Sequence, residues 1–222
     1  TTGTITATLD TSAIADLHDN TNGLQNLSRA HNLTFSIADA SVSAAQLNAL
    51  DAKTTVVIPV ASTTITGTYA DIVALYASNG VSGLGNEAIA PTQTLTAAQA
   101  NAINALTTGI ITETVTGDMA SLAALTLNLD SNGAQVVDNN NNAVQNAYTI
   151  APTDTTASAA ALSALITKTS VDIDTSNITT VTGTLAEVDA LYAGSGHANL
   201  GGEAITISDT GSLDADAFQR IN

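Results

Sequence analysis

The 222-residue chain contains no cysteine and no tryptophan. Without cysteine it can form no disulfide framework, and it has neither a thiolate nucleophile nor a cysteine-based metal site. Aromatic residues make up only 3% of the sequence, although hydrophobic residues make up 44%. The apolar side chains are mainly alanine, leucine, isoleucine and valine, which suit thin, regular layers better than a thick, irregular core.

Basic residues are also scarce. Four Lys and Arg stand against twenty Asp and Glu, so the formal net charge is −16. A surface of this charge repels phosphate backbones and anionic membranes, so nucleic acid is not an expected partner. Dispersed acidic residues are typical of a solvated face that prevents aggregation, and they can also collect divalent cations.

Long hydrophobic runs are missing as well. No apolar run approaches the roughly 18 residues of a membrane span, so we expect no insertion into a membrane. The first ten residues, TTGTITATLD, have neither the basic nor the apolar region of a signal peptide. We therefore expect any export signal to lie outside this chain.

One passage of the sequence occurs twice. TITGTYADIVALYA begins at Thr64, and TVTGTLAEVDALYA begins at Thr180. Self-similarity along a chain predicts a stacked repeat architecture. If a repeat begins with the hydroxyl-bearing pair that follows each second helix, the repeats are residues 1–53, 54–106, 107–168 and 169–222. The third repeat is longer, so we expect an insertion within residues 128–148, in a surface loop.

Each repeat is expected to open with a strand of alternating threonines and to continue into a first helix. An Asp or Thr before that helix can accept a hydrogen bond from an amide of its first turn, as an N-cap does. The predicted caps are Asp10, Thr68, Asp118 and Thr184. In two copies, Asp71 and Glu187 would complete a capping box. A leucine stands seven residues after each cap, and we expect these four to be buried at equivalent positions: Leu17, Leu75, Leu125 and Leu191.

Four further segments predict a second helix in each repeat. They begin at Ser43, Thr96, Ser158 and Asp214, and their apolar residues recur three positions apart, on one helix face. The equivalent pairs are Leu47 with Leu50, Ala100 with Ile103, Leu162 with Leu165, and Phe218 with Ile221. Between the two helices, the segments LTFSIA, EAIAPT, YTIAPT and EAITIS predict another strand.

A unit of strand, helix, strand and helix favours parallel strands with right-handed connections. One unit cannot bury its apolar faces alone, so neighbouring copies must stack. We therefore predict an α/β solenoid of about four stacked repeats of roughly 53 residues, with mainly parallel strands. A conventional doubly wound single domain is the alternative.

No pattern in the sequence indicates catalysis. His18, His31 and His197 fall at unrelated repeat positions, without HExxH spacing or a partner nucleophile, so we expect them at the surface. The glycines of GLGNE, which begins at Gly83, follow a helix, whereas a phosphate-binding loop places them before one. We expect a turn there, no catalytic or cofactor-binding residues, no required cofactor and no enzyme.

Calcium is the one ligand that the sequence indicates. In NLDSNGAQVVDN, Asn128, Asp130, Asn132 and Gly133 stand where an EF-hand loop has its positions one, three, five and six. Asn139 replaces the bidentate Glu at position twelve, and no matching helices flank the loop. We predict a calcium site formed by Asp130, Asn132 and Asp138, with an ordinary Asn-Gly-rich surface loop as the alternative.

Three motifs also carry a resemblance to a known group of proteins. They are TGTLAEVDALYA, the pair GLGNEAI and NLGGEAI, and SAAQLNALDAKTT. In these, the chain resembles the tandem Thr/Ala/Asp-rich repeats of giant cell-surface and haemolysin-like proteins of cyanobacteria and other aquatic bacteria. The resemblance implies a secreted, repetitive protein of the cell surface with a structural or adhesive role.

The expected function is that of a self-associating structural protein, such as a filament, sheath or S-layer building block. A repetitive adhesin stalk or spacer within a giant surface protein is the alternative. Rows of threonines also occur on ice-binding solenoids, but here we expect helices to cover one face of the strands. The opening TTGTIT corresponds to TTGIIT at Thr107, which directly follows a second helix. We therefore expect this chain to stack end to end, with copies of itself or with further repeats of a longer parent.

Overall fold

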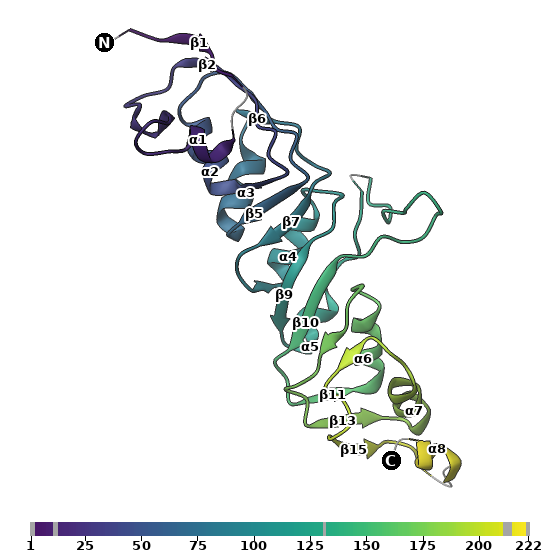
Figure 1. Ribbon diagram of the computed structural model, residues 1–222. Helices are drawn as coiled ribbons and strands as arrows, with labels where there is room; N and C mark the ends of the chain where they lie inside the picture. The colour runs from purple at the N-terminus through teal and green to yellow at the C-terminus, as the bar shows by residue number, and fades with distance from the viewer. Residues whose placement is uncertain (1–2, 11–12, 131, 211–214, 221–222) are drawn as a thin grey trace. The chain divides into compact units, whose positions relative to one another are not determined.

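The computed structural model is a mixed α/β structure with mostly parallel strands in several small sheets (Figure 1). It describes residues 3–10, 13–130, 132–210 and 215–220. Contacts group the chain into two compact units, one formed by Thr1–Gln93 with Ile103–Ile111 and the other by Thr94–Ala102 with Thr112–Asn222. We describe each unit by itself.

The first unit contains two parallel strand pairs and one three-stranded parallel sheet. The pairs are β1 with β2 and β4 with β6, and the sheet has the order β3-β5-β7. The elements are β1 (Thr6–Thr8), α1 (Ile14–Leu17), the 3-10 helix η1 (Leu24–Asn26), β2 (Asn32–Thr34), β3 (Ser41–Ser43), α2 (Ala44–Asp51), β4 (Ile58–Pro59), β5 (Thr64–Gly67), α3 (Tyr69–Ala77), β6 (Val81–Ser82) and β7 (Ala88–Pro91).

The second unit contains two three-stranded parallel sheets, β8-β9-β10 and β11-β13-β15, and the pair β12-β14. Helix α4 (Ala97–Asn104) begins in this unit, while its residues Ile103 and Asn104 belong to the first. The other elements are β8 (Leu95–Thr96), β9 (Thr112–Gly117), α5 (Met119–Ala123), β10 (Ala147–Pro152), β11 (Thr156–Ser158), α6 (Ala159–Ile166), β12 (Ile173–Asp174), β13 (Thr180–Gly183), α7 (Leu185–Ala193), β14 (His197–Ala198), β15 (Ala204–Ile207) and α8 (Ala215–Arg220).

The predicted strand with alternating threonines is the central strand of each three-stranded sheet, as β5, β9 and β13, and one strand of the β1-β2 pair, and its apolar residues contribute to the core. In β5, Ile65 lies between Val42 of β3 and Ile89 of β7, and none of the three is more than 2% exposed. Val181 of β13 takes the same place between Ala157 and Ile205. Alternation along the strand sends the threonines to the other face, where they are half-buried.

One set of strands was not predicted from the sequence. Strands β3, β8 and β11 come directly before the second helices, and they pair with β5, β9 and β13, the threonine-rich strands that come before the next first helix. Each of these strands buries one apolar side chain: Val42, Leu95 and Ala157. With these strands, each three-stranded sheet is built of strand, helix, strand, helix and strand in chain order.

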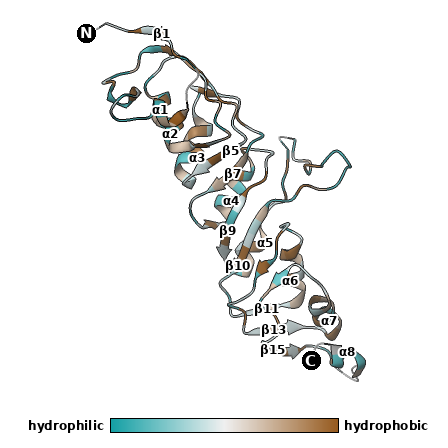
Figure 2. Cartoon of the chain, viewed as in Figure 1, coloured by the Kyte–Doolittle hydropathy of each residue, from teal (hydrophilic) through white to brown (hydrophobic). Residues whose placement is uncertain are grey.

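The four leucines of the first helix are buried, as predicted. The exposed fraction is 6% for Leu17, 0% for Leu75, 1% for Leu125 and 2% for Leu191. In Figure 2, brown apolar segments lie on the strands and helices, whereas the loop from α5 to β10 is mostly teal. No helix in the described part of the chain combines the length and apolarity needed to cross a membrane.

Three of the four predicted N-caps are confirmed. The side chains of Thr68, Asp118 and Thr184 each accept a hydrogen bond from the amide three residues later, at 3.2, 2.7 and 3.3 Å. The prediction for Asp10 was wrong, because α1 begins at Ile14 after the N-cap residue Ala13. The first amide of that helix is instead bound by Asp39, whose Oδ2 accepts from the Ile14 amide at 2.9 Å.

The predicted capping boxes have different outcomes. Glu187 completes a capping box, since its Oε2 accepts from the Thr184 amide at 2.8 Å. Asp71 does not reach the backbone of Thr68, and its Oδ2 accepts from the Thr68 hydroxyl at 2.7 Å. The aspartate side chain is one methylene shorter, which accounts for the difference.

The fourth second helix is present as α8, but its apolar residue is more exposed than those of the other copies. Leu47, Ala100 and Leu162 are all 0% exposed, but Phe218 is 43% exposed. Helix α6, which carries Leu162, lies between α5 and α7, whereas the neighbour of α8 is α7. Ile221, the other residue of this predicted pair, lies outside the described residues.

The capping box at Thr184 supplies a first testable result. We expect Thr184→Ala to lower the free energy of unfolding by about 0.5–2 kcal/mol, because the Glu187 amide loses its acceptor. Thermal or urea denaturation measures the change. Thr94→Ala serves as the comparison, because Thr94 is exposed in the loop between β7 and β8, and an equal loss from both variants would contradict the assignment.

Candidate functional site

The predicted calcium loop is formed by two successive turns of the same design. In the first, Asp130 Oδ1 accepts from the amides of Asn132 and Ala134, at 2.8 and 2.9 Å. In the second, Asp138 Oδ1 accepts from the amides of Asn140 and Asn142, both at 2.8 Å. Each turn closes with an antiparallel bridge: Leu129 with Gln135, and Val137 with Ala143. The insertion therefore contains a short internal repeat that the sequence analysis did not identify.

Backbone conformation explains the residues at the turn tips. Gly133 and Asn141 have φ angles of 78° and 63°, in the left-handed region that glycine and asparagine adopt most readily. The amides of Ala134 and Asn132 hold the pKa of Asp130 below its usual value. The backbone and side chain of Asn142, with the Asn140 amide, do the same for Asp138. Both carboxylates are thus ionised and already bind the amides of their own turns.

Calcium binding by this loop stays a prediction with a direct test. We expect weak binding, in the millimolar range of extracellular sites, because carboxylate and amide oxygens are suitable ligands but several already accept backbone hydrogen bonds. Isothermal titration calorimetry of the chain with calcium measures it. The double variant Asp130→Asn with Asp138→Asn is the control and should abolish the heat, whereas no heat from the unaltered chain would contradict the prediction.

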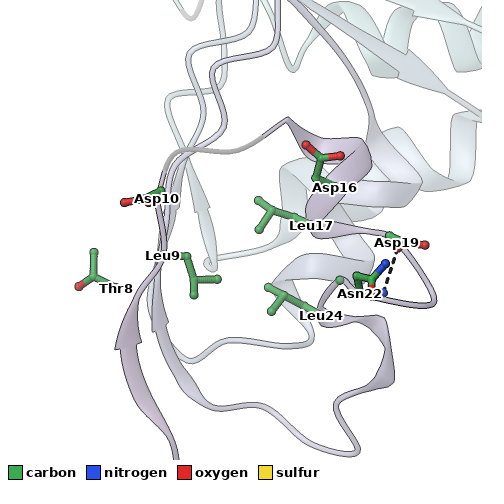
Figure 3. Close-up of a pocket in the computed structure, with 9 residues that line it drawn as sticks. Thr8, Leu9, Asp10, Asp16, Leu17, Asp19, Asn22 and Leu24 are labelled. Atoms are coloured by element: carbon green, nitrogen blue, oxygen red, sulfur yellow. Dashed lines mark hydrogen bonds between the residues drawn. The ribbon is translucent and has the colours of Figure 1, made fainter.

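An open depression of about 700 Å³ lies between the end of β1 and helices α1 and η1. Figure 3 shows Leu9, Leu17 and Leu24 pointing into it, while the side chains of Asp10 and Asp16 point away from its centre. Asp19 accepts hydrogen bonds from the amides of Thr21 and Asn22, so it organises its own turn. In the described ranges of the chain, no three His, Cys, Asp or Glu side chains group as they would around a metal ion.

One of the three histidines is not at the surface. His31 is 5% exposed, and its Nδ1 accepts from the Ile5 amide at 3.1 Å. The expectation of a surface position was therefore wrong for His31, because its ring binds the preceding strand segment. His18 and His197 are half-buried, and His197 Nε2 lies 3.0 Å from the carbonyl oxygen of Leu191.

The GLGNE segment is a bend held by its own glutamate. Glu87 is 3% exposed, and its carboxylate accepts from the amides of Gly85 and Asn86 at 2.9 and 3.0 Å. The second copy of this bend repeats the arrangement, since Glu203 accepts from the amide of Gly201 (2.9 Å) and from the hydroxyl of Tyr192 (2.7 Å). Burial raises the pKa of Tyr192, and the neighbouring Glu203 raises it further. These glutamates stabilise the backbone of the turns.

A repeated hydrogen bond joins successive segments of the chain. Thr54, Thr107 and Thr169 are 7%, 3% and 4% exposed. Their hydroxyls donate to the carbonyl oxygens of Leu33, Glu87 and Tyr148, at 2.7, 2.7 and 2.6 Å. Each hydroxyl also accepts from the amide two residues later: Val56, Gly109 and Val171. A buried threonine at this position therefore provides hydrogen-bond partners for two backbone groups, one carbonyl oxygen and one amide.

Removal of one of these hydroxyls should lower the stability of the fold. We expect Thr107→Val to lower the free energy of unfolding by about 1–3 kcal/mol, because the Glu87 carbonyl and the Gly109 amide lose their partner without a change of side-chain shape. Urea denaturation of the two proteins measures it. Thr94→Val is a suitable control, since Thr94 is exposed in the loop between β7 and β8, and an equal effect would contradict the role given to Thr107.

A second set of contacts between segments was missed by the sequence analysis. The first amide of each first helix donates to a side chain from the strand segment that follows that helix. Ile14 donates to Asp39, Met119 to Asp154 and Leu185 to Asp209, at 2.6 to 2.9 Å, and Tyr69 donates to Gln93 at 3.4 Å. The acceptor stands 24 to 35 residues after the donor residue at the start of the helix, so no local capping pattern indicates it.

The polar groups described above bind the backbone of the chain itself. They hold turns, helix starts and neighbouring segments in place. The chain matches no protein-family model, no curated protein and no solved structure.

Proposed function

We propose that the chain is a non-catalytic structural protein that associates with copies of itself outside the cell, as a building block of a filament, a sheath or an S-layer. The observation that carries this proposal is the threonine hydrogen bond between successive segments, which recurs at matching positions in both units. Buried polar groups that serve only to join neighbouring turns of chain suit an extended scaffold better than a small-molecule site.

In this proposal, the turns of chain stack as an α/β solenoid of about four repeats. It is supported by hydrogen bonds between segments that are 23 or 24 residues apart: Thr63 to Ala40, Thr66 to Val42, and Thr179 to Thr155. These bonds join neighbouring turns of chain within each unit, as the stacking of a solenoid would. We also propose that the likeness to tandem repeats of giant surface proteins reflects this architecture.

Self-association is supported by an edge strand. In the described part of the chain, β15 pairs with β13 and with no other strand. The backbone groups on the outer edge of such a strand are a template for another chain. With a net charge of −16, separate copies repel each other, so specific strand pairing must overcome this repulsion, and salt that screens it should favour association.

Electron microscopy of the native material, with the mass of the chain measured on the same sample, tests this function. A building block predicts regular assemblies of separate chains. More copies of the repeat within one very long chain would instead support the alternative of an adhesin stalk. Dispersed single chains in the native material would contradict the proposal.

A further inference from the structure

We propose that the segment Gly3–Thr6 of one copy docks beside β15 of a second copy, in the way that residues 109–111 lie beside β7 within the first unit. The inference rests on the self-association proposed above and names the two surfaces that carry it. The partner is a second copy because each surface is one half of a contact that the chain already makes internally.

The internal contact joins Ile111 to β7. Ile111 forms a parallel bridge with Ile89, and both side chains are 0% exposed. The Ile89 amide donates to the carbonyl oxygen of Ile110 at 3.0 Å. The Thr107 hydroxyl donates to the carbonyl oxygen of Glu87 at 2.7 Å. The receiving side of the contact thus consists of a glutamate and an isoleucine two residues later.

Both halves of this contact occur again on exposed parts of the chain. Ile5 is 45% exposed, whereas the isoleucines at the same repeat position are at most 1% exposed: Ile58, Ile111 and Ile173. On the receiving side, Glu203 and Ile205 of β15 are only half-buried, whereas Glu87 and Ile89 are 3% and 0% exposed. Docking would bury Ile5 against Ile205 as Ile111 is buried against Ile89.

A glycine accompanies the glutamate at this contact. A Cβ atom at Gly109 would lie 2.1 Å from the carbonyl oxygen of Glu87, which leaves no room for a side chain. Two other repeats have Val56 and Val171 at the position of Gly109. In those repeats the residue that replaces Glu87 on the receiving side is Leu33 or Tyr148. Whether this repeat position holds glycine or valine therefore depends on the segment beside which it packs.

Gly3 stands at the same repeat position as Gly109, yet its own chain does not require a glycine there. No atom lies within 4 Å of a Cβ built on Gly3. Glu203 repeats the role of Glu87, since its carboxylate accepts from the amide of Gly201 as Glu87 accepts from that of Gly85. Gly3 of one copy therefore matches Glu203 of the next.

The backbone around Ile5 leaves the required edge available. The Ile5 carbonyl oxygen accepts from the Asn32 amide at 2.8 Å, and the Ile5 amide donates to His31, so both groups face β2 and its preceding residue. Successive residues of an extended segment direct these groups to opposite edges. The Thr4 carbonyl oxygen thus faces away from β2, where the Ile205 amide of the second copy would donate to it.

Gly3→Val tests the docking surface. Sedimentation velocity is expected to show concentration-dependent assembly of the unaltered 222-residue chain and a weakening of Kd by about a hundredfold or more for Gly3→Val, because the valine overlaps the Glu203 carbonyl. The melting temperature should not change, since the new side chain meets no atom of its own chain. Thr4→Val is the matched control, because its counterpart Ile110 stays 41% exposed in the internal contact.

Cross-linking supplies a second measurement, because the natural chain has no cysteine. A mixture of Ile5→Cys chains with Ile205→Cys chains should give a disulfide-linked pair, and a mixture of Val137→Cys with Ile205→Cys should not. If the unaltered chain assembles but Gly3→Val assembles equally well and the first mixture does not cross-link, the docking surface is wrong while self-association stands. If the unaltered chain stays monomeric, both proposals fail.

Discussion

Replacement of Leu75 by alanine is expected to lower the free energy of unfolding by about 2–5 kcal/mol. Leu75 is 0% exposed in α3, and its helix packs on α2 and on β5. Truncation removes buried methyl groups and leaves a cavity that the surrounding segments fill only in part. Urea denaturation followed by circular dichroism measures the loss.

The matched control for Leu75 is Phe218. It is a larger apolar side chain on a helix, but it is 43% exposed, so Phe218→Ala should cost far less than Leu75→Ala. An unchanged stability of Leu75→Ala, or an equal loss in both variants, would contradict the assignment of Leu75 to the core.

Gly109→Val is expected to destabilise the chain by about 1–3 kcal/mol or more. Its Cβ would lie 2.1 Å from the carbonyl oxygen of Glu87 and 2.8 Å from the amide nitrogen of Ala88. Backbone atoms cannot rotate away as a flexible side chain can, so the two segments must move apart. This motion would also weaken the hydrogen bond from Thr107 to Glu87.

Gly3→Val is the control for Gly109→Val, because both place a valine at the same repeat position. The melting temperature should fall for Gly109→Val and stay unchanged for Gly3→Val, which has open space around it. Equal melting temperatures for the two variants would show that the close contact at Gly109 does not stabilise the fold.

The elements that were predicted correctly have strong local signals. Ile72 and Leu75 recur three positions apart after the cap Thr68, and both are 0% exposed. The strand around Ile65 alternates apolar and hydroxyl-bearing residues, and its burial alternates in the same way. Helix faces, caps and alternating strands depend on neighbours in sequence, so a sequence can indicate them. The boundaries of the four repeats remain a prediction.

The features that were missed depend on residues far away in the sequence. Strand β8 has only two residues, Leu95 and Thr96, and no alternation can be recognised over that length. Asp154 caps a helix that begins 35 residues earlier, at Met119. Phe218 fits the helical pattern of Leu162 but lacks the neighbouring helix on both sides that buries Leu162.

Calcium binding remains a prediction, but the loop that carries it can be compared with its sequence. The sequence indicated Asp130, Asn132 and Asp138 as oxygen ligands, and the structure places each aspartate at the start of a turn whose amides it binds. The doubling of the turn has a weak signal in the sequence, since Asp130 and Asp138 are each followed two residues later by an asparagine. Gly133 and Asn141 differ in type, so at that position of the turn the repeat appears only in their shared backbone conformation.

Sedimentation velocity of the unaltered chain across micromolar concentrations tests the central claim, self-association of a stacked repeat protein, most directly. We predict sedimentation coefficients that increase with protein concentration and with salt that screens the net charge of −16. A single species of 22.2 kDa at every concentration and salt would contradict the account.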